Sequence, residues 1–139
     1  MIKFKIIDVD IKPPVRATKG SAGIDLRLSS IKMYEKGVYT LGLGVAVEIP
    51  DQHFGLLAVR SSTGSKGLQL TNSVGIIDSD YRGELMMKCT FTHRGVDFPE
   101  VGDRIAQLII SPCLVDDVML SYDLGATERG DGSYGSTNS

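Results

Sequence analysis

The sequence contains no tryptophan, only two cysteines and no apolar run long enough to cross a bilayer. A membrane-spanning helix needs roughly 18 or more consecutive apolar residues, so we expect no membrane partner. The first residues, Met1 to Lys5, do not form the apolar core of a signal peptide. We therefore expect a cytoplasmic protein, or one of the host-cell interior if the chain is viral.

A basic excess is also missing. The chain has 15 Lys and Arg against 17 Asp and Glu, for a formal net charge of -2. Proteins that bind nucleic acid carry a basic face, so we expect no nucleic-acid partner. Cys89 and Cys113 lie in apolar contexts without CxxC spacing, which favours buried, reduced thiols over a disulfide or metal site. His53 and His93 have no partner at metal-ligand spacing, so we expect surface histidines.

What the chain does contain is 16 glycines and many short runs of alternating apolar residues. In residues 39–50, Leu41, Leu43, Val45 and Val47 share one parity, which predicts a single long strand. Only residues 61–66 suggest a short helical turn. Many short strands separated by turn signals predict one all-β sandwich or barrel. Further strands are expected over residues 4–10, 24–28, 53–59, 68–70, 74–77, 84–92 and 105–110.

The stretch from Asn72 to Met86 places two carboxylates, a tyrosine and a glycine between two apolar runs. This pattern predicts a hairpin, with two strands joined by a turn. Asp78 directly follows an aliphatic pair, where a carboxylate is costly unless it is solvated, paired or in use. Taken alone, the stretch favours a solvent-exposed polar turn over a catalytic one.

Two other segments combine glycines, hydroxyls and cations. In residues 60–67, three consecutive hydroxyls could cap a helical turn or bind a phosphate. In residues 129–137, glycine backbone N–H groups could converge on an anion, or the segment could be a disordered end. Residues 125–139 contain too little apolar surface to fold alone, so we expect a β domain over residues 1–124 followed by a flexible segment.

Five stretches resemble, in order, the five motifs of the trimeric dUTPases (dUTP diphosphatases). Each is weak alone, but together they extend from residue 22 to residue 137, nearly the whole chain. Their order makes a coincidental match untenable. The stretches are Ala22–Arg27, Arg60–Gly64, Asn72–Gly83, Gly102–Leu108 and Arg129–Thr137.

The resemblance implies a jelly-roll-like β fold and a homotrimer with active sites shared between subunits. It implies hydrolysis of dUTP to dUMP and pyrophosphate with Mg²⁺, which limits uracil incorporation into DNA and supplies dUMP for dTTP synthesis. Asp78 would be the general base that activates water against the α-phosphorus. Asp25 and Gln107 would hold water ligands of the Mg²⁺, and Gln107 would also contact substrate. Phosphate contacts from the neighbouring subunit would come from Arg60, Ser61, Ser62 and Gly64.

The same resemblance implies how the nucleoside is read. Tyr81 would lie under the deoxyribose and exclude a ribose 2′-hydroxyl. Uracil would be matched by the Asn72 side chain and by backbone near Gly75, Ile76, Ile77 and Met86. The C-terminal segment would close over the substrate as a lid, through Arg129, Tyr134, Gly135, Ser136 and Thr137.

The chain departs from the family pattern at four positions, none of which removes a proposed catalytic group: Leu28, Val59, Tyr134 and Asn138. Asp103 and Arg104 are candidates for a structural ion pair and not for catalysis. Two alternatives stay open: a dCTP deaminase, which shares the fold, and a trimeric nucleotide-sensing or regulatory binding protein. A second role in binding a protein regulator is also compatible with the sequence.

Overall fold

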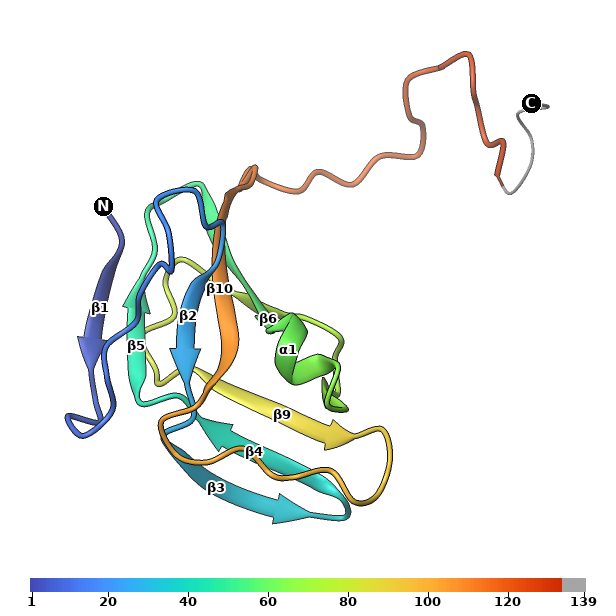
Figure 1. Cartoon of the computed structure of the whole chain (residues 1–139). Helices are drawn as coiled ribbons and strands as arrows, with labels where there is room; N and C mark the ends of the chain where they lie inside the picture. The colour runs from blue at the N-terminus through green and yellow to red at the C-terminus, as the bar shows by residue number, and fades with distance from the viewer. Residues whose placement is uncertain (134–139) are drawn as a thin grey trace.

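The computed structural model describes residues 1–133, which form short antiparallel strands and one helical turn (Figure 1). The predicted all-β fold is confirmed. The elements are β1 (Lys3–Ile6), β2 (Ile24–Arg27), β3 (Ser30–Glu35), β4 (Val38–Gly42), β5 (Val45–Glu48), β6 (His53–Val59), α1 (Ser61–Gly64), β7 (Leu68–Leu70), β8 (Gly75–Ile77), β9 (Met86–Phe91) and β10 (Arg104–Pro112).

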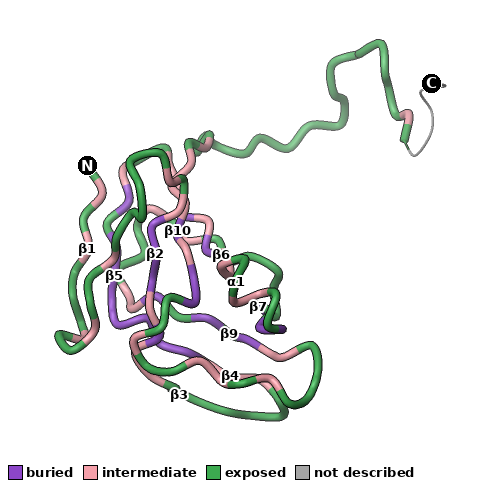
Figure 2. Tube along the Cα trace, viewed as in Figure 1, coloured by how far each residue is buried: buried purple, intermediate pink, exposed green. Residues whose placement is uncertain are grey.

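Two four-stranded sheets make up most of the domain, with strand orders β2-β10-β6-β8 and β3-β4-β9-β7. A third, two-stranded sheet pairs β1 with β5. Buried stretches on β2, β4, β5, β9 and β10 face one another in the middle of the domain (Figure 2). The core is mainly aliphatic, and its fully buried side chains include Leu26, Leu41, Leu57, Leu85 and Leu108.

The single strand predicted over residues 39–50 is wrong. The chain bends between β4 and β5, and the two strands join different sheets: β4 pairs with β9, and β5 pairs with β1. Gly44 makes the bend with φ +67°, a backbone conformation that favours glycine. A Cβ at Gly44 would lie 2.9 Å from side-chain atoms of both Asp8 and Ser29. Alternation continues across the bend, so the sequence pattern does not reveal it.

The predicted hairpin is wrong as well. β8 pairs with β6 in one sheet, whereas β9 pairs with β4 and β7 in the other. Residues 78–85, called here the inter-sheet turn, therefore connect the two sheets. Leu85 anchors the end of this turn, because it is fully buried, donates its N–H to Val45 O at 2.8 Å and accepts from Leu43 N at 3.0 Å. β8 forms the edge of its sheet.

Three further outcomes concern local structure. The helical turn α1 is confirmed, but the hydroxyls do not cap it: Arg60 occupies the N-cap position with no side-chain cap hydrogen bond. β3 was not predicted, and its residues are mostly exposed, so its sequence shows little alternation. None of the described helices is long and apolar enough to cross a membrane.

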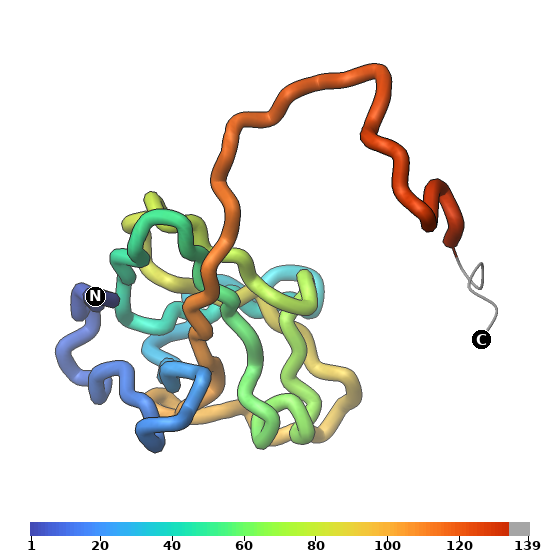
Figure 3. Tube along the Cα trace, turned by 90° about the horizontal axis from the view of Figure 1, so that it is seen from above, coloured from blue at the N-terminus to red at the C-terminus, as the bar shows by residue number. Residues whose placement is uncertain are grey.

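After β10, residues 113–133 leave the β domain as an extended segment in both views (Figures 1 and 3). No strand is assigned in this segment.

Candidate functional site

Asp25 on β2 is a buried carboxylate, only 7% exposed. Its Oδ1 lies 3.0 Å from Arg60 Nε, and its Oδ2 accepts a hydrogen bond from Arg104 Nη1, also at 3.0 Å. A buried carboxylate is tolerated when cations and hydrogen bonds compensate for its lost hydration. The expected Asp103–Arg104 ion pair is wrong, because Arg104 reaches Asp25 and Asp103 Oδ2 instead accepts the Glu100 N–H at 2.9 Å.

Strand register brings the partners of Asp25 together. Gln107 on β10 is the register partner of Asp25 on β2 and of Ala58 on β6, and Arg60 follows the end of β6. Gly23 packs against Gln107 so closely that an added Cβ would collide with Gln107 Oε1. A cavity of about 310 Å³, called here the Asp25 cavity, is lined by Ala17, Ser21, Ala22, Gly23, Asp25, Arg60, Ser61 and Gln107.

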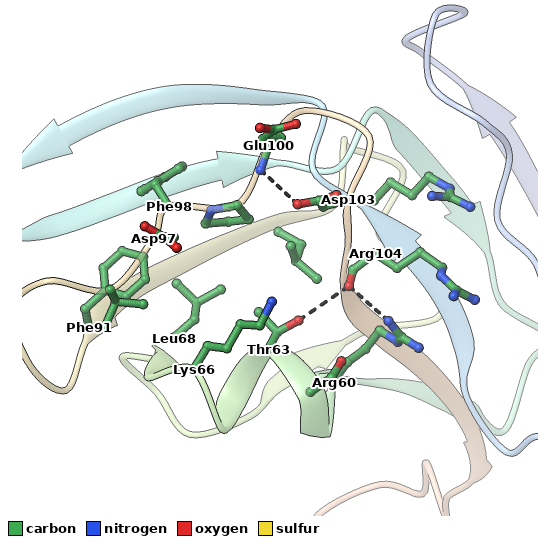
Figure 4. A pocket seen from close by; sticks show the side chains of 15 residues that line it. Arg60, Thr63, Lys66, Leu68, Phe91, Asp97, Phe98, Glu100, Asp103 and Arg104 are labelled. Atoms are coloured by element: carbon green, nitrogen blue, oxygen red, sulfur yellow. Dashed lines mark hydrogen bonds between the residues drawn. The ribbon is translucent and has the colours of Figure 1, made fainter.

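A larger cavity of about 460 Å³ is also lined by Arg60 and lies between α1 and the start of β10 (Figure 4). Arg60 Nη1 and Thr63 Oγ1 both donate to the Arg104 carbonyl, at 3.2 and 3.4 Å, which ties α1 to β10. Ser62 lines this cavity and not the Asp25 cavity, and Gly64 lines neither. The lining of the larger cavity carries both signs of charge. Its cations are Arg27, Arg60, Lys66 and Arg104, and its carboxylates are Asp97, Glu100 and Asp103.

The inter-sheet turn lines a separate cavity of about 300 Å³, called here the Asp78 cavity. It joins the expected residues Ile76, Ile77, Asp78, Tyr81 and Met86 to three that the sequence did not suggest, Thr40, Leu85 and Lys88. Asn72 and Gly75 do not line this cavity.

Backbone and side-chain contacts shape the turn around Asp78. Tyr81 N donates to Asp78 O at 3.2 Å, and the Tyr81 hydroxyl donates to Glu84 O at 3.0 Å. An added Cβ at Gly83 would collide with the Tyr81 hydroxyl oxygen. The turn is therefore compact, and Tyr81 is held against it.

Within residues 1–133, the two sets of site residues line separate cavities. The linings of the Asp25 and Asp78 cavities have no residue in common. Arg129 is exposed on the extended segment, where its Nε donates to Gly132 O at 2.9 Å. The predicted contacts at Tyr134, Gly135, Ser136 and Thr137 lie outside the described residues.

Both cysteines are free thiols, but only Cys89 is buried; Cys113 is half-buried, so that part of the expectation is wrong. Burial raises the pKa of Cys89 to about 12. Within residues 1–133, no group of three or more His, Cys, Asp or Glu side chains is placed to hold a metal ion. The described residues thus offer the single buried carboxylate of Asp25, with the Gln107 amide opposite it in register.

Two further residues were missed by sequence reasoning. Arg104 was set aside as structural, yet it contacts Asp25 directly. Glu84 directly follows the third motif, Asn72–Gly83, but its side-chain partners, Gly44 and Lys32, are distant in sequence. For Arg104, the only signal in the sequence was the neighbouring opposite charge of Asp103. That signal indicated an Asp103–Arg104 pair, whereas the observed partner is Asp25.

The domain combines a cavity lined by Asp25 and Arg60 on one sheet with an acidic turn between its two sheets. This combination is typical of an enzyme that acts on charged small molecules. The family model described as dUTPase matches residues 10–138. The chain belongs to the dUTPase family.

Its relatives match over almost their full length. It is 42% identical to the deoxyuridine 5'-triphosphate nucleotidohydrolase of Methylibium petroleiphilum, covering 98% of this chain and 96% of the relative. With the protein of the same name from Idiomarina loihiensis, it is 39% identical, covering 96% and 95%. Among solved structures, the dUTPase of Staphylococcus bacteriophage 80alpha with dUPNHPP aligns with a TM-score of 0.80 and 25% identity, covering 100% of this chain and 99% of that one.

Proposed function

We propose that this chain hydrolyses dUTP to dUMP and pyrophosphate as a homotrimer whose active sites combine groups from different subunits. One observation supports an active site shared between subunits: the predicted catalytic and binding residues are divided between two cavities. Asp78 and most of the predicted nucleoside-reading residues line one: Ile76, Ile77, Tyr81 and Met86. Asp25, Arg60, Ser61 and Gln107 line the other. A complete site therefore requires the Asp78 cavity of one subunit to face the Asp25 cavity of another.

Asp78 acts as the general base. It accepts a proton from the water whose oxygen bonds to the α-phosphorus, and the bond from that phosphorus to the bridging oxygen breaks. Pyrophosphate leaves with the electron pair. Asp78 follows the end of β8, is exposed, and lines the cavity with Tyr81. Phosphoryl transfer leaves the protein mainly the tasks of positioning and charge stabilisation, for which one oriented carboxylate suffices.

Arg60 and the hydroxyls of α1 bind the phosphates. A guanidinium group forms paired, charge-assisted hydrogen bonds with phosphate oxygens. Ser61 and Ser62 are exposed, and their hydroxyls are not used as helix caps, so both can donate to a ligand. Arg60 is oriented by Asp25 and by the Arg104 carbonyl.

The Asp25 cavity fits Mg²⁺ that arrives with the triphosphate. Mg²⁺ keeps several waters and takes its other oxygens from one or two carboxylates and substrate phosphates. Asp25 supplies one oriented carboxylate, whose oxygens retain acceptor capacity for water beside their arginine contacts. Gln107 lies opposite it in register. When bound, the ion would neutralise charge on the triphosphate.

The edge position of β8 supports base recognition. A strand at the edge of a sheet has unpaired backbone N–H and C=O groups, and uracil presents two acceptors flanking one donor. Backbone at Gly75, Ile76, Ile77 and Met86, with the Asn72 side chain, would read this pattern. Cytosine would leave polar groups unpaired, a mismatch that can cost about 10⁴-fold in rate.

The extended segment supports the assembly. Val118, Leu120 and Leu124 are each more than 90% exposed in a single chain, and Leu114 and Met119 more than 80%. Contiguous exposed apolar surface marks an interaction site. We propose that this segment crosses to another subunit and that residues 125–139 close over the substrate, with Arg129 contacting phosphate.

The test is pyrophosphate release from dUTP, dCTP, UTP and dTTP, with Mg²⁺ and with EDTA, alongside ammonia release from dCTP. We expect turnover of dUTP alone, lost with EDTA, and a trimeric mass by light scattering. Asp78→Asn should abolish turnover while dUTP still binds. Ammonia release from dCTP would establish the deaminase instead, and dUTP binding without turnover would indicate a binding protein.

A further inference from the structure

Tyr81 is positioned through Glu84. The Tyr81 hydroxyl donates to the Glu84 backbone carbonyl at 3.0 Å, while its ring and hydroxyl occupy the space that a side chain at Gly83 would need. The wall that Tyr81 forms in the Asp78 cavity therefore lies where the Glu84 peptide places it.

The Glu84 side chain in turn contacts Lys32 on β3 and Gly44 in the bend between β4 and β5. It is only 16% exposed; its Oε1 accepts the Gly44 N–H at 3.0 Å, and its Oε2 lies 3.0 Å from Lys32 Nζ. Gly42 leaves room for this arrangement, because an added Cβ there would lie 2.5 Å from Lys32 Cε and 2.7 Å from Glu84 Oε1. The contact is thus built into the β3–β4 side of the domain.

The backbone of Gly44 is held in place by burial and hydrogen bonds. It is buried, it makes the bend between β4 and β5, and its carbonyl accepts the N–H groups of Ile7 and Asp8 at 2.9 and 3.0 Å. The acceptor that the structure gives its own N–H is Glu84. A buried N–H without an acceptor is unfavourable, so this hydrogen bond resists any shift of the inter-sheet turn.

We propose that Glu84 is a positioning residue for sugar discrimination: its hydrogen bond to Gly44 holds the Glu84 carbonyl, the carbonyl holds Tyr81, and Tyr81 excludes the ribose 2′-hydroxyl. This inference rests on the proposed function. Lys32 offsets the cost of the poorly solvated carboxylate. Glu84 itself touches no reacting atom and acts only through Tyr81.

Glu84→Ala removes the acceptor, and Glu84→Gln retains an amide oxygen for Gly44. The matched control is Glu48→Ala, which removes the carboxylate of another Lys–Glu pair, 2.7 Å from Lys3. For each protein, kcat/KM is measured for dUTP and for UTP, together with the melting temperature.

We expect Glu84→Ala to lower the ratio of kcat/KM for dUTP over UTP by about tenfold or more, because a freed Tyr81 makes room for the ribose. Glu84→Gln and Glu48→Ala should stay within about threefold of the unchanged protein. A merely structural role would lower both rates alike and leave the ratio unchanged, and that result overturns the proposal.

If Glu84→Ala does not fold, Tyr81→Phe tests the proposal instead. This variant keeps the ring and removes the hydroxyl that donates its hydrogen bond to the Glu84 carbonyl. An unchanged ratio in that variant overturns the proposal. If the unchanged protein does not hydrolyse dUTP, the proposed function fails and the positioning role falls with it. If it hydrolyses dUTP but neither variant moves the ratio, only the positioning role fails.

Discussion

Two variants that are each impaired in a different half of the site should restore activity when their subunits assemble together. Asp78→Asn disables the Asp78 cavity and should lower kcat by about 10²–10⁴-fold, the usual contribution of a general base. Asp25→Asn disables the other cavity; losing a carboxylate that orients metal ligands typically costs about 10–100-fold. The two cavities share no lining residue, so each variant leaves the other half-site intact.

When equal amounts of the two variants assemble at random, the fraction of intact sites can be calculated. Each site takes its Asp78 half from one subunit and its Asp25 half from another. In a trimer that contains both variants, about one site in three receives two intact halves, so doubly tagged trimers should reach about a third of the unchanged activity. The unselected mixture also contains trimers of a single variant and should reach about a quarter. The two variants are co-expressed with different tags, and doubly tagged trimers are assayed for pyrophosphate release; trimers prepared separately and mixed without exchange are the control.

A site contained in one chain would behave differently. Every subunit in the mixture carries one disabled half, so activity would stay at the mean of the two variants. Doubly tagged trimers without restored activity would refute the shared site, although dUTP hydrolysis itself could still stand.

Four other outcomes follow from features described above. Truncation before Arg129 should lower kcat severely while the trimeric mass is retained; an unaffected rate in the pyrophosphate assay would rule out the lid. Gly23→Ala should displace the Gln107 side chain, because the new Cβ would collide with Gln107 Oε1. It should lower kcat/KM for dUTP while the melting temperature stays close to that of the unchanged protein. Cys113 should react with a thiol reagent at pH 8 well before Cys89, whose pKa is raised by burial to about 12; equal labelling by mass spectrometry would contradict this. Because burial raises the pKa of Cys89 above the ordinary thiol value of 9.0 to about 12, the unfolded chain loses this proton first. The contribution of Cys89 to stability is therefore present below about pH 9 and is lost as the pH rises from there.

Local patterns predicted the strands whose boundaries are set by neighbouring residues. The strands over residues 53–59 and 68–70 have the expected bounds, because apolar alternation there ends at turn residues. Alternation indicates which face of a strand is buried but not which strand lies beside it. For this reason the bend at Gly44 and the separation of β8 from β9 into different sheets were both missed.

The candidate site followed the same division. The motifs indicated Asp25, Arg60 and Gln107, and strand register does place Asp25 opposite Gln107. The contacts from Arg104 to Asp25 and from Glu84 to Gly44 join residues far apart in the chain, so neither could be predicted from spacing. The catalytic and binding roles themselves came from family resemblance, and the mixing and truncation experiments test them.

The inter-sheet turn also has a consequence for how the domain unfolds. Its two ends belong to β8 and β9, which lie in different sheets, so a nucleotide held between them fastens the sheets to each other. Binding to the folded state adds to its stability by mass action. With ligand bound, amide hydrogen exchange should therefore slow in both sheets, in β6 on one side of the turn and in β4 on the other. The two sheets would then open together in one cooperative step.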